Sequence, residues 1–129
     1  MSGIITAEIL RAWASRLCNA RSSAPADLAA VLGVPLDSPS PGIIGARARG
    51  GDIPLVELDL ADHLPLGDFD RLLGTGNRLP RVDWDRPHVI AYTIEVPRAP
   101  YRCVLLASCD QPPSATAPVA RVSFRLDRV

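Results

Sequence analysis

The 129-residue sequence contains no lysine, and all fourteen of its basic residues are arginine. Fourteen aspartate and glutamate residues balance them, so the formal net charge is zero. Proteins that bind nucleic acids or membrane surfaces usually carry a basic excess, so this balance supports neither function. Arginine suits bidentate contacts with carboxylates better than lysine does, but composition alone does not show that such contacts are used.

Aromatic residues are also scarce, at 5% of the chain, so leucine, valine and isoleucine must fill most of the core. No apolar run approaches the roughly 20 residues that a membrane span requires. The first residues, MSGIITAEILRAW, lack a basic region ahead of their apolar residues and include Glu8, which is not the pattern of a secretory signal. We therefore expect a cytoplasmic protein.

Only three cysteines occur, and their odd number disfavours a framework of disulfide bonds. Cys103 and Cys109 fall in or beside one expected strand, where six residues of extended chain span about 20 Å. That separation is far beyond disulfide reach. We expect Cys18, Cys103 and Cys109 to be reduced and to pack as small apolar side chains. Their spacing is not that of a metal site, and we expect neither a metal nor a cofactor.

Three segments predict helices, and all lie in the first 74 residues. The length and the apolar content of 47% predict a single domain, residues 1–129, with one core. Cap residues and apolar residues at helical spacing mark each helix. The expected helices are about 14 residues after the N-cap Thr6, a second from Pro25 to Gly33, and a short one from Pro65 to Gly74.

Two extended segments are expected between the second and third helices. Gly42 to Arg49 predicts a short strand. Leu55 to Leu60 predicts a clearer one, because apolar side chains alternate with the acidic Glu57 and Asp59. We expect irregular chain at residues 35–42, around His63 and at residues 75–87.

The last forty residues predict three further strands. The first two, about 89–96 and 101–107, are joined by the short connection PRAP, which suits an antiparallel hairpin. The third, 119–126, alternates most clearly. Together these patterns predict an α+β fold, with N-terminal helices on one face of a mostly antiparallel sheet of four to five strands. The opposite face should carry Glu95, Arg121 and Arg125, and the residues expected to face the helices are Ile90, Tyr92, Ile94, Val122, Phe124 and Leu126.

No motif in the sequence is a catalytic signature. The two histidines, His63 and His88, stand in no known nucleophile pattern, and G-x-S-x-G is absent. The segment GTGNRLP at 74–80 fits a helix end and a turn better than a phosphate-binding loop. We expect no catalytic residue. The alternative is a small enzyme or ligand-binding domain with a pocket between helices and sheet, in which His63, His88, Tyr92 and Cys103 are the first candidates.

Acidic residues are segregated along the chain. Six of them fall between Gly50 and Asp70, and no arginine lies in that stretch. Such a segment predicts either a docking surface for a basic protein or a solvated face that Arg121 and Arg125 partly neutralise across the sheet. Trp84, in RVDWDRPH, is of the residue type most enriched at interface hot spots. The expected partner-binding residues are Glu57, Asp59, Asp62, Asp68, Asp70 and Trp84.

The order of these elements resembles the small cytosolic immunity proteins of bacterial toxin systems. The resemblance rests on the N-terminal helices, the acidic strand, the short helix PLGDFDRLLG and the final strands ending in VARVSFRLDR. It implies a compact α+β domain that binds and blocks another protein, such as a basic toxin or an enzyme, and it assigns no role to any single residue. A further alternative is a structural subunit of a bacterial assembly, or a homodimer, paired through the last strand if that strand lies at the sheet edge.

Overall fold

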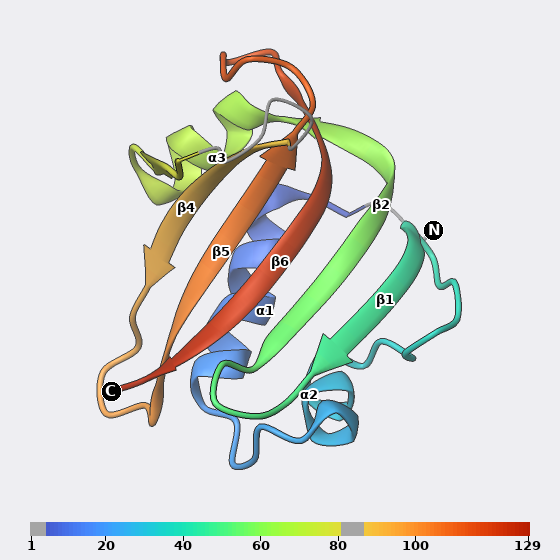
Figure 1. Cartoon of the computed structure of the whole chain (residues 1–129), viewed down its shortest axis with the longest axis vertical. Coiled ribbons are helices and arrows are strands. Elements are labelled where there is room, and N and C mark those ends of the chain that lie inside the picture. The colour runs from blue at the N-terminus through green and yellow to red at the C-terminus, as the bar shows by residue number, and fades with distance from the viewer. Residues whose placement is uncertain (1–4, 81–86) are drawn as a thin grey trace.

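The computed structural model describes residues 5–80 and 87–129. In this part of the chain two helices precede the first strand (Figure 1). The elements are α1 (Ala7–Cys18), α2 (Pro25–Leu32), β1 (Ile43–Arg49), β2 (Leu55–Pro65), α3 (Leu66–Leu73), β3 (Asn77–Arg78), β4 (His88–Ile94), β5 (Tyr101–Cys109) and β6 (Pro118–Arg128).

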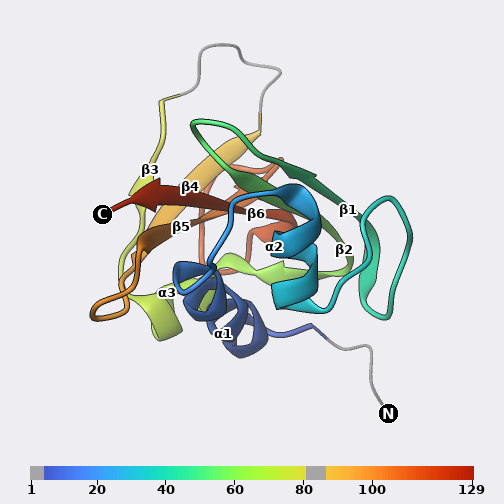
Figure 2. The ribbon, with the colours of Figure 1, turned by 90° about the horizontal axis from the view of Figure 1, so that it is seen from below.

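The strands form one antiparallel sheet in the order β1-β2-β6-β5-β4-β3. The helices lie on one face of this sheet, as Figure 2 shows. The predicted α+β class is confirmed, but the sheet has six strands in the described chain instead of four to five. No helix within residues 5–80 or 87–129 is both long enough and apolar enough to cross a membrane.

The helix ends follow from local chemistry. At the start of α1 the hydroxyl of Thr6 accepts a hydrogen bond from the backbone N–H of Ile9 at 3.3 Å, as expected for an N-cap. Pro25 occupies the first turn of α2, and Gly33 ends that helix with φ 68°, a left-handed conformation that glycine adopts without a steric penalty. Gly74 follows α3 and donates its N–H to the carbonyl of Asp70. Gly74 therefore marks the end of α3, as predicted, but the segment that follows is not only a turn, because it includes the strand residues Asn77 and Arg78.

The core lies between the helices and one face of the sheet. Leu10 and Leu17 of α1 and Leu105 of the interior strand β5 are all fully buried. The six residues expected to face the helices are at most 9% exposed, which confirms the predicted faces of β4 and β6. These residues are Ile90, Tyr92, Ile94, Val122, Phe124 and Leu126.

Two predictions about the chain around the sheet are wrong. The chain around His63 is not a loop, because β2 continues to Pro65. Its pairing with β6 shifts register between Asp59 and Leu64, and such an irregularity interrupts the alternation that marks a strand in sequence. Within the stretch predicted to be irregular, Asn77 and Arg78 form β3, which is too short to carry any periodic signal.

The last strand does not lie at a sheet edge. β6 pairs with β2 on one side and with β5 on the other, so its backbone groups are used within the chain. Assembly by strand addition to β6 is therefore excluded, because such addition needs an unpaired edge.

Candidate functional site

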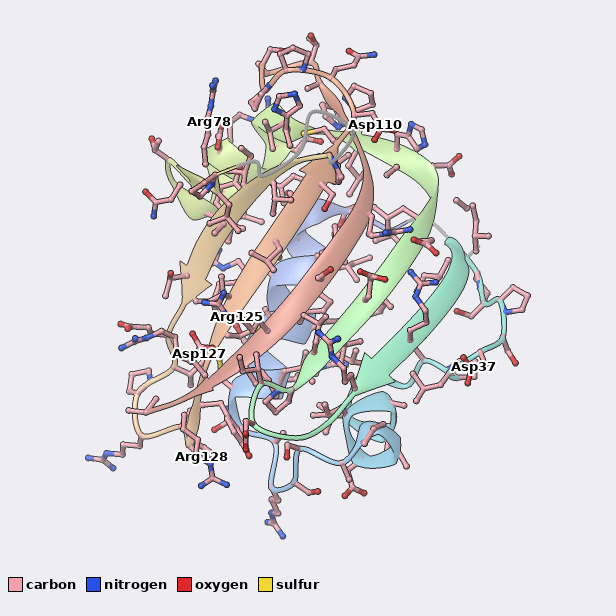
Figure 3. The ribbon with its side chains drawn as sticks, in the orientation of Figure 1. Asp37, Arg78, Asp110, Arg125, Asp127 and Arg128 are labelled. Atoms are coloured by element: carbon pink, nitrogen blue, oxygen red, sulfur yellow. The ribbon has the colours of Figure 1, made fainter. Side chains whose placement is uncertain are left out.

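The face of the sheet opposite the helices is called here the outer face, and none of the described helices covers it (Figures 1 and 2). Figure 3 shows Arg125 and Asp127 projecting from it on β6. Glu95 and Arg121 are exposed and Arg125 is half-buried. The alternation of β6 places both arginines opposite its core residues, and Glu95 pairs with Arg102, so the predicted positions on this face are confirmed. Its residues alternate with those of the core, and they include Arg47, Glu57, Asp59, Arg102, Val104, Leu106, Arg121, Ser123, Arg125 and Asp127.

Arginines from the neighbouring strands hold two of the three acidic side chains of β2, Glu57 and Asp59. Arg47 of β1 donates to Glu57 Oε1 at 3.0 Å and to Asp59 Oδ2 at 2.9 Å. Arg121 of β6 donates to Asp59 Oδ1 at 2.8 Å. Asp59 stands directly opposite Arg121, and Glu57 directly opposite Arg47, so the register of the sheet fixes these pairs.

The two arginines change the ionisation of Asp59. The hydrogen bond from Arg47 is the main cause that lowers the pKa of this carboxyl, and the bond from Arg121 adds to it, while partial burial acts in the opposite direction. Two guanidinium groups therefore keep Asp59 ionised and fixed in position between β1 and β6.

This lowered pKa predicts a dependence of stability on pH. Because the folded-state pKa is depressed, Asp59 stabilises the fold above its unfolded-state pKa of about 3.9, and that contribution is lost as the pH falls through the folded-state pKa. We expect Asp59→Asn to lower the free energy of unfolding by about 1 kcal/mol or less at pH 7. The difference from the unchanged protein should shrink at pH 3, as measured by urea unfolding.

The control for this measurement is Asp110→Asn, at an exposed position that forms no ion pair with another described residue. It should change stability little at either pH. An effect of Asp59→Asn that is equal at pH 7 and pH 3 would contradict the role assigned to the two arginines.

The remaining predicted acidic residues lie elsewhere. Asp68 pairs with Arg71 on α3, and Asp70 accepts a 2.7 Å hydrogen bond from the hydroxyl of Tyr92, a core residue. Burial first, and then this bond to Asp70, raises the pKa of Tyr92. The structure thus brings Glu57 and Asp59 together on the outer face and places Asp68 and Asp70 on the helix that caps the core.

The last two predicted partner-binding residues are Asp62 and Trp84. Asp62 is exposed on the irregular second half of β2. Trp84 lies outside the described residues. The acidic residues that lie close in sequence therefore do not all lie on one surface, and arginines partly neutralise two of them, Glu57 and Asp59. Of the two arginines expected to neutralise the acidic residues, Arg121 pairs with Asp59, whereas Arg125 pairs with Asp127.

A groove of about 330 Å³ lies on the outer face near the end of β5. Ile44, which is 62% exposed, contributes to its wall. His63, Ser108 and Asp110 also line it, but within the described chain no hydrogen bond joins these three side chains. Asp110 is labelled in Figure 3 at this end of the sheet. Sequence reasoning missed Ile44, because a single exposed apolar residue in a strand carries no distinguishing pattern.

The four residues proposed for a pocket between helices and sheet are not brought together. Tyr92 and Cys103 are core residues, at 2% and 0% exposure, and burial raises the pKa of the Cys103 thiol. His63 lines the groove on the outer face, whereas His88 lines a separate one of about 250 Å³ beside β3. Within residues 5–80 and 87–129 no three His, Cys, Asp or Glu side chains are grouped to hold a metal ion.

No family model matches the chain, and neither a curated protein nor a solved structure is found to be similar to it.

Proposed function

We propose that this protein is a non-enzymatic binding domain that neutralises a partner protein by occlusion, with the outer face as its contact surface. The observation that carries the proposal is the set of arginines on this face, which carboxylates hold in place. Arg47 and Arg121 are fixed on Glu57 and Asp59, Arg102 on Glu95 at 2.7 Å, and Arg125 on Asp127 at 3.0 Å.

Arginine is among the residue types most enriched at the energetic centres of protein interfaces. A guanidinium that is already held by a neighbouring carboxylate loses less side-chain freedom when a partner binds it, which reduces the entropic cost of association. The outer face therefore presents several arginines whose guanidinium groups are already hydrogen-bonded to carboxylates of the same face.

On the outer face the acidic pair Glu57 and Asp59 of β2 lies between Arg47 of β1 and Arg121 of β6, and charges of both signs are interspersed across the sheet. A partner must match such a pattern in register, and complementarity of this kind supplies specificity and speeds the encounter more than it adds affinity. The resemblance of the element order to immunity proteins of bacterial toxin systems supports a toxin or an enzyme as the partner, bound in the cytoplasm. In this proposal the partner recognises the arrangement of positive and negative side chains on the outer face. Recognition does not require a surface that is acidic throughout.

The proposal predicts which group of charges matters for binding. The partner to be tested is the protein encoded by the neighbouring gene, with affinity measured by calorimetry. Replacing Glu57, Asp59 and Arg121 together by Gln, Asn and Gln should weaken binding by about thirtyfold or more, since hot-spot losses reach 2 kcal/mol and above. The matched variant Asp68→Asn with Asp70→Asn should leave affinity within about threefold, because exposed charges outside an interface contribute little.

Both variants keep the side-chain size, and Asp70→Asn retains an oxygen that can accept the Tyr92 hydroxyl bond. Circular dichroism and thermal unfolding check that each variant is folded. If only the α3 variant loses affinity, the contact surface is on the helix side of the sheet. If neither does, the outer-face charges are merely solvated and the proposed surface is wrong.

A further inference from the structure

A second hollow, of about 490 Å³, lies at the end of the sheet where β4 turns into β5. Its apolar wall is formed by Val96, Pro97, Ala99 and Tyr101. Figure 1 shows this turn beside the end of β6, at the opposite end of the sheet from α3. The N–H of Val129 donates to the carbonyl of Pro100 at 3.2 Å and ties the end of β6 to the turn. The hollow is thus built by three segments that hydrogen bonds hold together.

The turn itself holds an arginine in a conformation that favours glycine. Ala99 donates its N–H to the carbonyl of Val96 at 3.2 Å, which closes a turn with Pro97 and Arg98 at its centre. Arg98 has φ 66°. A positive φ at the third position of a turn that follows proline is normally occupied by glycine. Residues held in such unfavourable conformations cluster at sites that clamp ligands.

Among the side chains that line the hollow, two are guanidinium groups, Arg98 and Arg102, and one is a carboxylate, Glu95. Arg98 is exposed and forms no ion pair with another described residue. Arg102 also lines the hollow and donates to Glu95 at 2.7 Å. The guanidinium of Arg128 adjoins the same region, 5.9 Å from the centre of the Tyr101 ring, and is labelled in Figure 3. An apolar wall beside several arginine side chains complements a molecule with an apolar body and one anionic group.

We propose that this hollow binds a small amphipathic anion. Its carboxylate would accept hydrogen bonds from Arg98 and Arg102, and its apolar body would lie against Val96, Pro97 and Tyr101. The proposal is independent of the outer face as a protein-binding surface, since it uses a different part of the sheet and a different class of ligand.

The first test compares three probes of equal chain length by NMR titration of the full chain. Octanoate supplies the anion, octanol is neutral and octylammonium is a cation. Octanoate should bind about tenfold or more tightly than octanol, because a hydrogen bond to a charged group is worth about that factor. Octylammonium should bind most weakly, because two guanidinium groups and one carboxylate line the hollow. Equal binding of octanoate and octanol, or no binding of octanoate, overturns the proposal.

The second test uses variants whose expected effects differ in sign. Arg98→Gly removes the free guanidinium and places glycine where φ is positive, so octanoate affinity should fall about tenfold while the melting temperature rises. Glu95→Gln removes the competing carboxylate and should tighten octanoate binding by about threefold, in line with a partly exposed ion pair. Arg11→Gln, exposed on α1, is the control for a general loss of positive charge.

The octanoate affinities of these three variants, taken together, test the assigned contacts. If Arg98→Gly binds octanoate as well as the unchanged chain, or if Glu95→Gln binds it less well, the assigned contacts are wrong. An equal loss in Arg11→Gln would show that octanoate responds only to the charge of the whole molecule. Because Arg98→Gly should increase stability, a loss of affinity in it does not arise from unfolding.

Discussion

Replacing Phe124 with alanine is expected to lower the free energy of unfolding by about 3–5 kcal/mol. Phe124 is fully buried on β6, between Val56 of β2 and Leu105 of β5, and it faces the helices. Its removal takes away apolar burial and leaves a cavity where the interior strands meet. Since domains are stable by only about 5–15 kcal/mol in total, this variant should lose a large share of its stability. Urea unfolding followed by circular dichroism measures the loss.

The neighbouring residue supplies the matched control. Arg125 is adjacent in sequence but projects to the outer face, where it pairs with Asp127. Arg125→Gln should therefore cost about 1 kcal/mol or less, as exposed ion pairs do. Equal losses in Phe124→Ala and Arg125→Gln would mean that the two faces of β6 are wrongly assigned.

The three thiols are expected to resist chemical labelling in the folded protein almost completely. Cys18 and Cys103 are 0% exposed and Cys109 is 1% exposed, and all three are free. Burial is the first cause that raises the pKa of each thiol, which disfavours the reactive thiolate. Labelling by Ellman's reagent at pH 7 should be about a thousandfold slower or more than in urea, because it requires the core to open.

Comparison with the alanine variant tests this mechanism. Phe124→Ala raises the population of open chains, so its thiols should react faster by a factor that follows its loss of stability. Rapid labelling of one cysteine in the unchanged, folded protein would contradict the burial described for that residue. Three equivalents should react in urea in every case, which calibrates the measurement.

Much of the fold could be predicted because its signals are local. Thr6, Pro25 and Gly33 mark helix ends by their own backbone and side-chain chemistry. The alternation of β4 and β6 predicts which residues are buried, since neighbouring side chains in a strand point to opposite faces. The two-residue β3 and the continuation of β2 past Leu60 could not be predicted, because neither contains a regular period.

The surface was harder to predict because it depends on strand order. Sequence shows that residues 50–70 contain acids and no arginine, but not which strands flank β2. In the sheet β2 lies between β1 and β6, and Arg47 and Arg121 come to within 3 Å of Asp59 from the two sides. The identity of the binding partner is harder still to predict from sequence, because it depends on the surface that the assembled strands form together.

The place of β6 in the sheet also constrains how the chain can fold during its synthesis on the ribosome. Two pairs of strands, β1 with β2 and β4 with β5, are neighbours in both sequence and sheet, so each pair can form early as a hairpin. β6 lies between the two pairs in the sheet and is translated after both. Leu55 pairs with Arg125, seventy positions later (125 − 55), so this contact closes a long loop. Until β6 has emerged, both β2 and β5 present unpaired edges, and nascent chains on neighbouring ribosomes are exposed to pairing between such edges.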